Sequence, residues 1–213
     1  MKATIVFDNT TTRPDLIADW GFACVIETAE QTILFDTGAD GQILMQNMAA
    51  LHIDPKSIQT VFISHNHFDH VGGLSAFLNA NSDVTVYVPQ SLRGVRKAKE
   101  VVYIDDKPRE ISKGLYTTGE LEGIEQSLVL ETNKGLIVFV GCSHPDMKVI
   151  LGAASRYGKL FGIIGGLHGF DQYDLFQGLE LICPTHCTQH KQEIRERFGD
   201  RVIEGGVGKV IEI

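Results

Sequence analysis

The feature that most constrains this chain is a cluster of four potential metal ligands within six residues. They are His65, His67, Asp69 and His70. The apolar run 60–64 precedes them and two glycines follow, so we expect a buried strand, a tight turn and then a helix. A turn at a strand end aims several side chains at one point, whereas a helix spreads them around its axis. Imidazole and carboxylate groups suit a borderline divalent ion such as zinc. One catalytic zinc uses about three protein ligands, so four predict two metal ions.

Three more histidines each follow an apolar run and then a glycine or a proline. They are His144 after residues 138–140, His168 after 162–164 and His186 after 181–183. Six of the eight histidines therefore lie at expected strand ends, which is a recurrence that chance does not explain. The other two, His52 and His190, have polar neighbours and are expected to be solvated.

The apolar pattern predicts one domain of mixed α/β structure over residues 1–213. Residues 41–51 have helical spacing with Asp40 as a cap, and residues 23–28 and 32–35 suggest a hairpin. Further strands are expected at 3–7, 60–64, 84–88, 127–132, 136–140, 160–164, 181–183, 202–203 and 209–213, and further helices at 71–78, 145–156, 173–178 and 189–198. Strands come first and then alternate with helices in both halves, which favours two face-to-face sheets with helices outside. This is a four-layer αββα sandwich.

Composition excludes several classes of function. The net charge of −8 argues against a broad nucleic-acid or anionic-membrane surface, although a local basic patch over residues 93–99 remains. No run approaches the roughly 20 apolar residues of a membrane span, and the first apolar run is too short for a signal peptide. None of the four cysteines forms a Cys-x-x-Cys pair, so we expect reduced thiols and a cytoplasmic protein.

Several motifs carry a resemblance to a known family over nearly the whole chain. Leu34-Phe35-Asp36-Thr37-Gly38 and the 65–70 cluster resemble motifs of the metallo-β-lactamase superfamily. Gly141-Cys142-Ser143-His144, Gly165-Gly166-Leu167-His168 and Pro184-Thr185-His186-Cys187-Thr188 resemble the branch labelled ribofuranosyl-aminobenzene 5′-phosphate synthase-like, whose members are also called metal-dependent hydrolases. Pro145-Asp146, Leu167 and Gln189 depart from that branch and concern the substrate pocket rather than the metal site. The resemblance implies the metallo-β-lactamase fold.

The resemblance also implies a ligand assignment. His65, His67 and His144 would bind one metal ion, and Asp69, His70 and His186 the other. Asp36 would orient a ligand through a hydrogen bond. Most members have a bridging Asp where this chain has Cys142, so either Cys142 provides a thiolate, or it is a buried thiol and His144 fills the gap. The second interpretation is favoured.

The expected function is that of a metal-dependent hydrolase, in which two divalent metal ions activate water. Zn²⁺ is the expected metal, with Mn²⁺ and Fe²⁺ as the alternatives. The expected substrate is a phosphoester or another small ester-like molecule, with Asp69 orienting the water. His168 is either an extra ligand or the acid that protonates the leaving group. Residues 93–99 form either a solvated face or a rim that attracts phosphate, and Trp20 either packs or covers the metals. The alternative functions are a non-catalytic metal-containing module that binds a pterin- or nucleotide-like ligand, and di-iron redox chemistry.

Overall fold

The strands form two mixed sheets in the computed structural model, which describes residues 1–213. The first sheet has the order β13 (Val210–Glu212), β1 (Lys2–Phe7), β2 (Ala23–Glu27), β3 (Thr32–Phe35), β4 (Thr60–Phe62), β5 (Thr85–Pro89) and β6 (Glu100–Ile104). The second has the order β12 (Leu181–Thr185), β11 (Leu160–Gly166), β10 (Gly135–Val140), β9 (Leu128–Thr132), β8 (Leu115–Thr117) and β7 (Arg109–Ser112). The run β3 to β6 is parallel, and so is the run β10 to β12.

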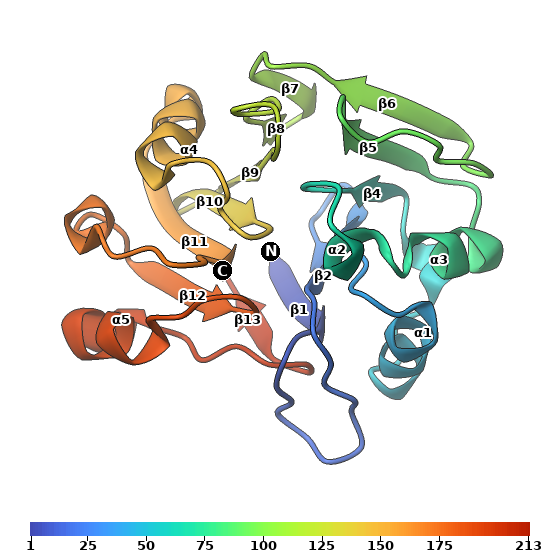
Figure 1. Ribbon diagram of the computed structural model, residues 1–213, viewed down its shortest axis with the longest axis horizontal. Helices are drawn as coiled ribbons and strands as arrows, with labels where there is room; N and C mark the ends of the chain where they lie inside the picture. The colour runs from blue at the N-terminus through green and yellow to red at the C-terminus, as the bar shows by residue number, and fades with distance from the viewer.

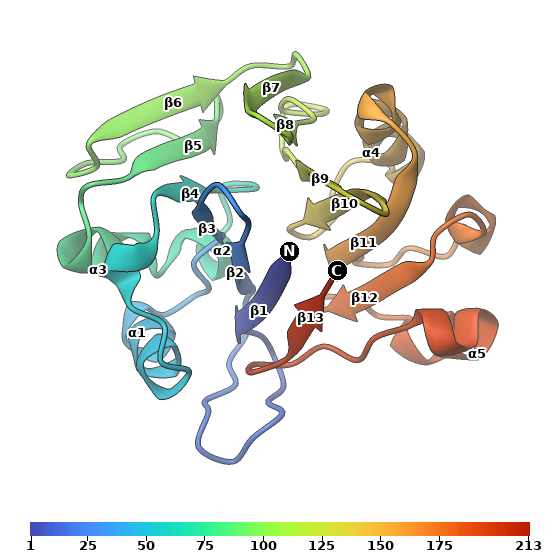
Figure 2. The same cartoon turned by 180° about the vertical axis from the view of Figure 1, so that it is seen from behind.

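Helices cover the outer face of each sheet, as Figures 1 and 2 show. The α-helices are α1 (Gly41–Ala50), α2 (Phe68–Val71), α3 (Leu74–Ala80), α4 (Met147–Ala154) and α5 (Lys191–Phe198). Three buried apolar clusters separate the layers. One lies between the sheets and includes Phe35 and Phe139, and the second joins Leu44 of α1 and Phe77 of α3 to the first sheet. The third joins α4 and α5 to the second sheet. The expected four-layer αββα sandwich is confirmed.

Most of the expected elements form, with differences at some of them. Asp40 caps α1 by accepting hydrogen bonds from the backbone N–H groups of Gln42 and Ile43, and β2 and β3 form the expected hairpin. Residues 173–178 form only a short 3-10 helix (Tyr173–Phe176), and the expected strand at 202–203 is an isolated bridge between Ile182 and Val202. Strands β6 and β7 are not expected from the pattern. No helix of the structure is both long and apolar enough to span a bilayer.

The parallel arrangement brings the candidate ligands together, because the carboxyl ends of β3, β4, β10, β11 and β12 meet at one end of the sandwich. In α/β sheets this end is where ligands bind. Asp36, Ser143, His168 and His186 follow these strands and have φ values of 53°, 58°, 45° and 44°. Non-glycine residues seldom adopt this left-handed region, and four of the seven that do so in this chain are these residues at strand ends.

Candidate metal centre

Three imidazole rings converge in what we call the first ligand group, made of His65, His67 and His144. One nitrogen of each lies within 4.8 Å of the other two. His67 Nδ1 is 3.1 Å from His65 Nε2 and 3.1 Å from His144 Nε2. His65 and His67 leave the end of β4, whereas His144 follows β10 on the other sheet. The first group therefore bridges the two sheets.

The second ligand group contains Asp69, His70, Cys142 and His186, whose ligand atoms also lie within 4.8 Å of one another. His70 Nε2 is 3.2 Å from Cys142 Sγ, and His186 Nε2 is 3.1 Å from Asp69 Oδ2. All four residues are buried. The structure thus brings all six sequence-predicted ligands into two groups. It also places Cys142 in the second group, while His144 lies in the first.

Asp36 fixes the tautomers of two candidate ligands. Its Oδ2 is 2.7 Å from His70 Nδ1 and accepts a hydrogen bond from Ser64 Oγ at 2.7 Å. Because the Ser64 hydroxyl donates to Asp36, it can only accept from His65 Nδ1, which lies 2.8 Å away. Both rings then carry their proton on Nδ1, so their Nε2 lone pairs point into the centre. Hydrogen bonds of this kind orient metal ligands in proteins.

A second set of contacts holds His186. Asn9 Oδ1 lies 2.9 Å from His186 Nδ1 and accepts a hydrogen bond from Gly21 N–H, so the oxygen rather than the amide nitrogen faces the ring. Asp8 accepts a hydrogen bond from the backbone N–H of His186 at 2.8 Å. With its proton on Nδ1, His186 turns a lone pair toward the Asp69 carboxylate 3.1 Å away. Two acceptors so close repel each other unless a cation lies between them.

These donors fit divalent metal ions. Burial lowers the pKa values of His65, His70 and His144, so all three are neutral at pH 7 and present lone pairs. Burial alone would raise the pKa of Asp69, but the close approach of His186 and His70 outweighs it and keeps this carboxylate ionised. Neutral imidazole nitrogens with an ionised carboxylate and a sulfur atom are the donors that zinc prefers.

The carboxylate of Glu125, which the sequence reasoning missed, organises the loop that carries Cys142 and His144. Its Oε1 accepts the backbone N–H groups of Gly141, Cys142 and Ser143 at 2.9, 3.1 and 3.1 Å, and its Oε2 accepts that of His144 at 2.9 Å. The side chain is buried, and burial raises its pKa to about 7 against the lowering effect of these donors. Glu125 thereby fixes a ligand of each group at once.

His168 lies beside the two ligand groups rather than within them. It approaches Cys142 and Cys187, and its ring centroid is 5.4 Å from that of His144. The interaction between the Cys142 and Cys187 thiols lowers the pKa of Cys187 to about 6 and raises the pKa of Cys142 well above its usual value. A cavity of about 240 Å³ adjoins this side of the centre, with His144 and His168 in its lining. His168 can therefore contact a molecule that lies over the first group.

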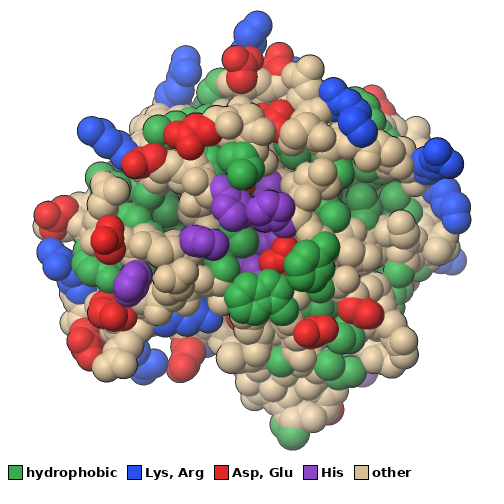
Figure 3. Space-filling view, in the orientation of Figure 1, with side chains coloured by type: hydrophobic (Ala, Val, Ile, Leu, Met, Phe, Trp, Pro, Cys, Tyr) green, Lys and Arg blue, Asp and Glu red, His purple; other side chains and the backbone are tan.

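The surface around the centre is aromatic rather than basic. Trp20 Nε1 donates to Asp69 Oδ2 at 2.9 Å, and the indole ring meets His186 edge-on at 4.9 Å. Figure 3 shows hydrophobic side chains beside the exposed histidines, with Lys and Arg toward the periphery of this face. In the basic segment 93–99, Arg93 lies over the Tyr103 ring and Lys97 donates to Asn79. Neither contact involves a candidate ligand.

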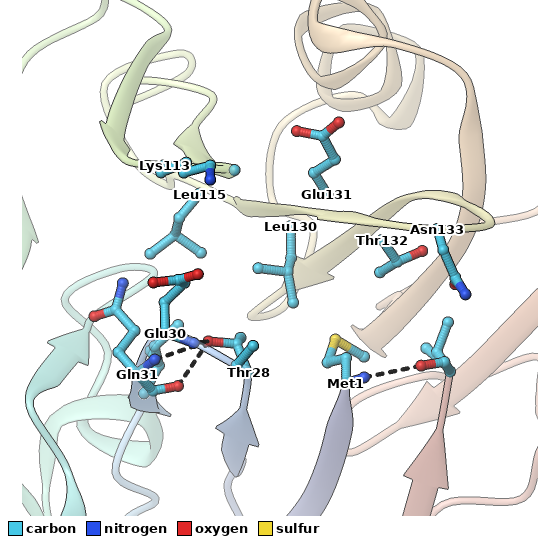
Figure 4. Close-up of a pocket in the computed structure, with 14 residues that line it drawn as sticks. Met1, Thr28, Glu30, Gln31, Lys113, Leu115, Leu130, Glu131, Thr132 and Asn133 are labelled. Carbon is cyan, nitrogen blue, oxygen red and sulfur yellow. Dashed lines mark hydrogen bonds between the residues drawn. The ribbon is translucent and has the colours of Figure 1, made fainter.

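A larger cavity, of about 450 Å³, lies where β3 and β10 begin, at the opposite end of the strands from the ligands (Figure 4). The β2–β3 and β9–β10 turns contribute Glu30 and Asn133, and the apolar side chains of Leu115 and Leu130 line it between them. None of the candidate ligands borders this cavity.

Comparisons with known proteins agree with the fold. The model of the metallo-beta-lactamase superfamily matches residues 21–154. The 7,8-dihydropterin-6-methyl-4-(beta-D-ribofuranosyl)-aminobenzene-5′-phosphate synthase of Methanocaldococcus jannaschii is 26% identical, over 86% of this chain and 85% of the relative. The ribonuclease Z of Aeropyrum pernix is 27% identical over 57% of this chain but only 33% of its own length. A crystallised metal-dependent hydrolase of the beta-lactamase superfamily has a TM-score of 0.81 and 23% identity, and covers 100% of this chain and 99% of its own.

Proposed function

Because the chain belongs to the metallo-β-lactamase superfamily, we propose that it is a metal-dependent hydrolase with two divalent metal ions at this centre. His65, His67 and His144 would hold one ion, and Asp69, His70, Cys142 and His186 the other. The main support is the pair of converging ligand groups, in which hydrogen bonds direct the lone pairs of His65, His70 and His186 inward. Zinc is the proposed metal, because imidazole, carboxylate and thiolate ligands suit it.

The proposed substrate is a phosphoester or another small ester-like molecule. Two divalent ions bound at such a centre polarise a carbonyl or phosphoryl oxygen and lower the pKa of water enough to supply a nucleophile near pH 7. The similarity to a ribonuclease Z supports a phosphoester. The similarity to a synthase over most of the chain supports a second candidate, transfer of a group to an acceptor other than water.

Two side chains have proposed catalytic roles. Asp69 is ionised, buried and held by His186 and Trp20, so it can accept a hydrogen bond from the attacking water and fix its direction. His168 is exposed and lies next to His144, on the side of the 240 Å³ cavity. From there it can deliver a proton to a leaving group, which makes the acid role a better fit than that of an extra ligand.

A hydrolysis panel tests this proposal. The chain, loaded with Zn²⁺ or Mn²⁺, is assayed on bis(4-nitrophenyl) phosphate, 4-nitrophenyl phosphate, a lactone and a thioester. We expect turnover on at least one class, a loss of more than about 100-fold in Asp69→Ala, and a smaller loss in His168→Gln. His52→Ala changes an exposed histidine outside the centre and should match the wild type. No turnover on any class, with a nucleotide or pterin bound tightly, would instead support the non-catalytic module.

A further inference from the structure

Three exposed apolar side chains lie on or next to the segments that surround the metal centre. Ile17, Trp20 and Phe68 have 40%, 51% and 67% of their surface exposed. Only three other large hydrophobic side chains in the chain are exposed to this degree, namely Tyr103, Val149 and Val210. Single exposed apolar residues are common, but a group of them around a polar centre marks a surface that contacts another molecule.

The two aromatic members of this group border the same ligand. Phe68 lies between His67 and Asp69 and begins helix α2. The segment that carries Trp20 contacts Asp69 directly: Phe22 N–H donates to the Asp69 carbonyl at 3.2 Å, and the indole N–H donates to its carboxylate at 2.9 Å. A molecule with its reactive group at the centre would therefore have Trp20 and Phe68 within reach.

Trp20 is a fixed surface rather than a mobile side chain. The hydrogen bond to Asp69 and the edge-on contact with His186 set the direction of the ring while half of it remains exposed. The next residue has to be glycine, since Gly21 has a φ of 145° and a Cβ there would lie 2.6 Å from the Asp69 carbonyl oxygen. A preformed aromatic face binds a ring at little cost in conformational entropy.

Charge does not offer an alternative means of recognition here. The cavity next to His144 is lined by Asp146 and Asp171 and by no Lys or Arg. Figure 3 likewise shows Lys and Arg toward the periphery of the face that carries the histidines. The cavity therefore offers no cation for a substrate to contact, whereas Trp20 and Phe68 offer exposed aromatic surface.

We propose that Trp20 and Phe68 form a subsite for a planar aromatic or heteroaromatic ring carried by the substrate. This inference rests on the proposed function, because it assumes that the reacting group lies at the metal centre. The ring would stack on the exposed face of Trp20, with Phe68 closing the other side of the subsite.

Trp20 is the only tryptophan of the chain, so its fluorescence reports directly on the subsite. The zinc-loaded protein is titrated with methylphosphonate, cyclohexylphosphonate and phenylphosphonate, which share the anionic group but differ in the attached ring. We expect phenylphosphonate to quench Trp20 and to bind about tenfold tighter than methylphosphonate, since stacking of one ring is worth a factor of this order. Cyclohexylphosphonate has a similar apolar area without a flat face, and it should bind more weakly than phenylphosphonate.

Calorimetric titration of variants completes the test. Trp20→Ala and Phe68→Ala should lose most of the preference for phenyl over methyl, whereas Trp20→Phe, which keeps a ring but loses the N–H group, should retain much of it. Tyr103→Ala removes an exposed aromatic residue from β6 and should bind all three ligands as the wild type does. Equal affinities for the phenyl and methyl ligands, or a preference unchanged in Trp20→Ala, would overturn the subsite. Methylphosphonate binding without a phenyl preference would overturn the subsite alone and leave the proposed function standing.

Discussion

Replacement of Glu125 is the change whose consequences the structure defines most closely. This carboxylate accepts four backbone N–H groups, three on Oε1 and that of His144 on Oε2. In Glu125→Gln the amide oxygen can replace Oε1, but the NH₂ group then meets the N–H of His144. One buried donor loses its acceptor, and three charge-assisted bonds become neutral.

The expected magnitude combines a loss and a gain. The unpaired donor costs about 1–3 kcal/mol, and the three weakened bonds cost about 1 kcal/mol each. Glutamine avoids the burial of a charge, the effect that raises the pKa of Glu125 to about 7, and this gain offsets the weakening of the three bonds. The net loss in the free energy of unfolding is therefore about 1–3 kcal/mol, so a domain of ordinary stability should still fold.

Metal affinity is the more sensitive readout, because the donor that loses its partner belongs to His144. We expect the first ligand group to bind zinc about 10–100-fold more weakly in Glu125→Gln, as measured by competition with a chelator at pH 8. Glu120→Gln is the matched control, since Glu120 is also buried but accepts only Ser91 N–H, away from the centre. If both variants bound zinc alike at both groups, the positioning role of Glu125 would be refuted.

Two further predictions concern the ligands. Cys142→Ser should weaken the second group about tenfold and abolish the thiolate-to-metal charge-transfer band of the cobalt-loaded protein; a band that persists would identify another thiol as the ligand. Burial lowers the pKa values of His65, His70 and His144 in the folded protein below the value of 6.5 expected in the unfolded chain. At a pH between the folded and unfolded pKa values, the unfolded chain therefore binds more protons than the folded one. The metal-free protein should therefore be less stable to urea at pH 5.5 than at pH 7.5. Cys187, whose pKa is lowered to about 6, acts in the same direction, so four groups oppose the three buried carboxyls Asp8, Asp36 and Glu125, whose pKa values are raised. Equal or greater stability at pH 5.5 would contradict that assignment.

The local parts of the centre could be predicted from the sequence, because one strand end and its turn position four ligands within six residues. The same holds for α1, whose cap and apolar spacing are local. Strands β6 and β7 could not be predicted, because most of their residues are exposed or half-buried and lack an apolar alternation.

The roles of Cys142 and His144 could not be separated from spacing alone. The sequence treated them as competitors for one vacancy, whereas the structure puts them in different ligand groups. The reason is the left-handed backbone of Ser143, with φ of 58°, which turns the chain between them. Glu125 was missed for a related reason, since its partners lie 16 to 19 residues further along and reach it only through the β9–β10 hairpin.

The number of metal ions bound per chain tests the central claim most directly. Native mass spectrometry of the zinc-reconstituted protein, with elemental analysis of the same sample, should give two ions per chain. His144→Ala and His186→Ala each remove a ligand from one group only, so each should retain one tightly bound ion. A single ion in the wild type, or the loss of both ions in either variant, would contradict a centre built from two ligand groups.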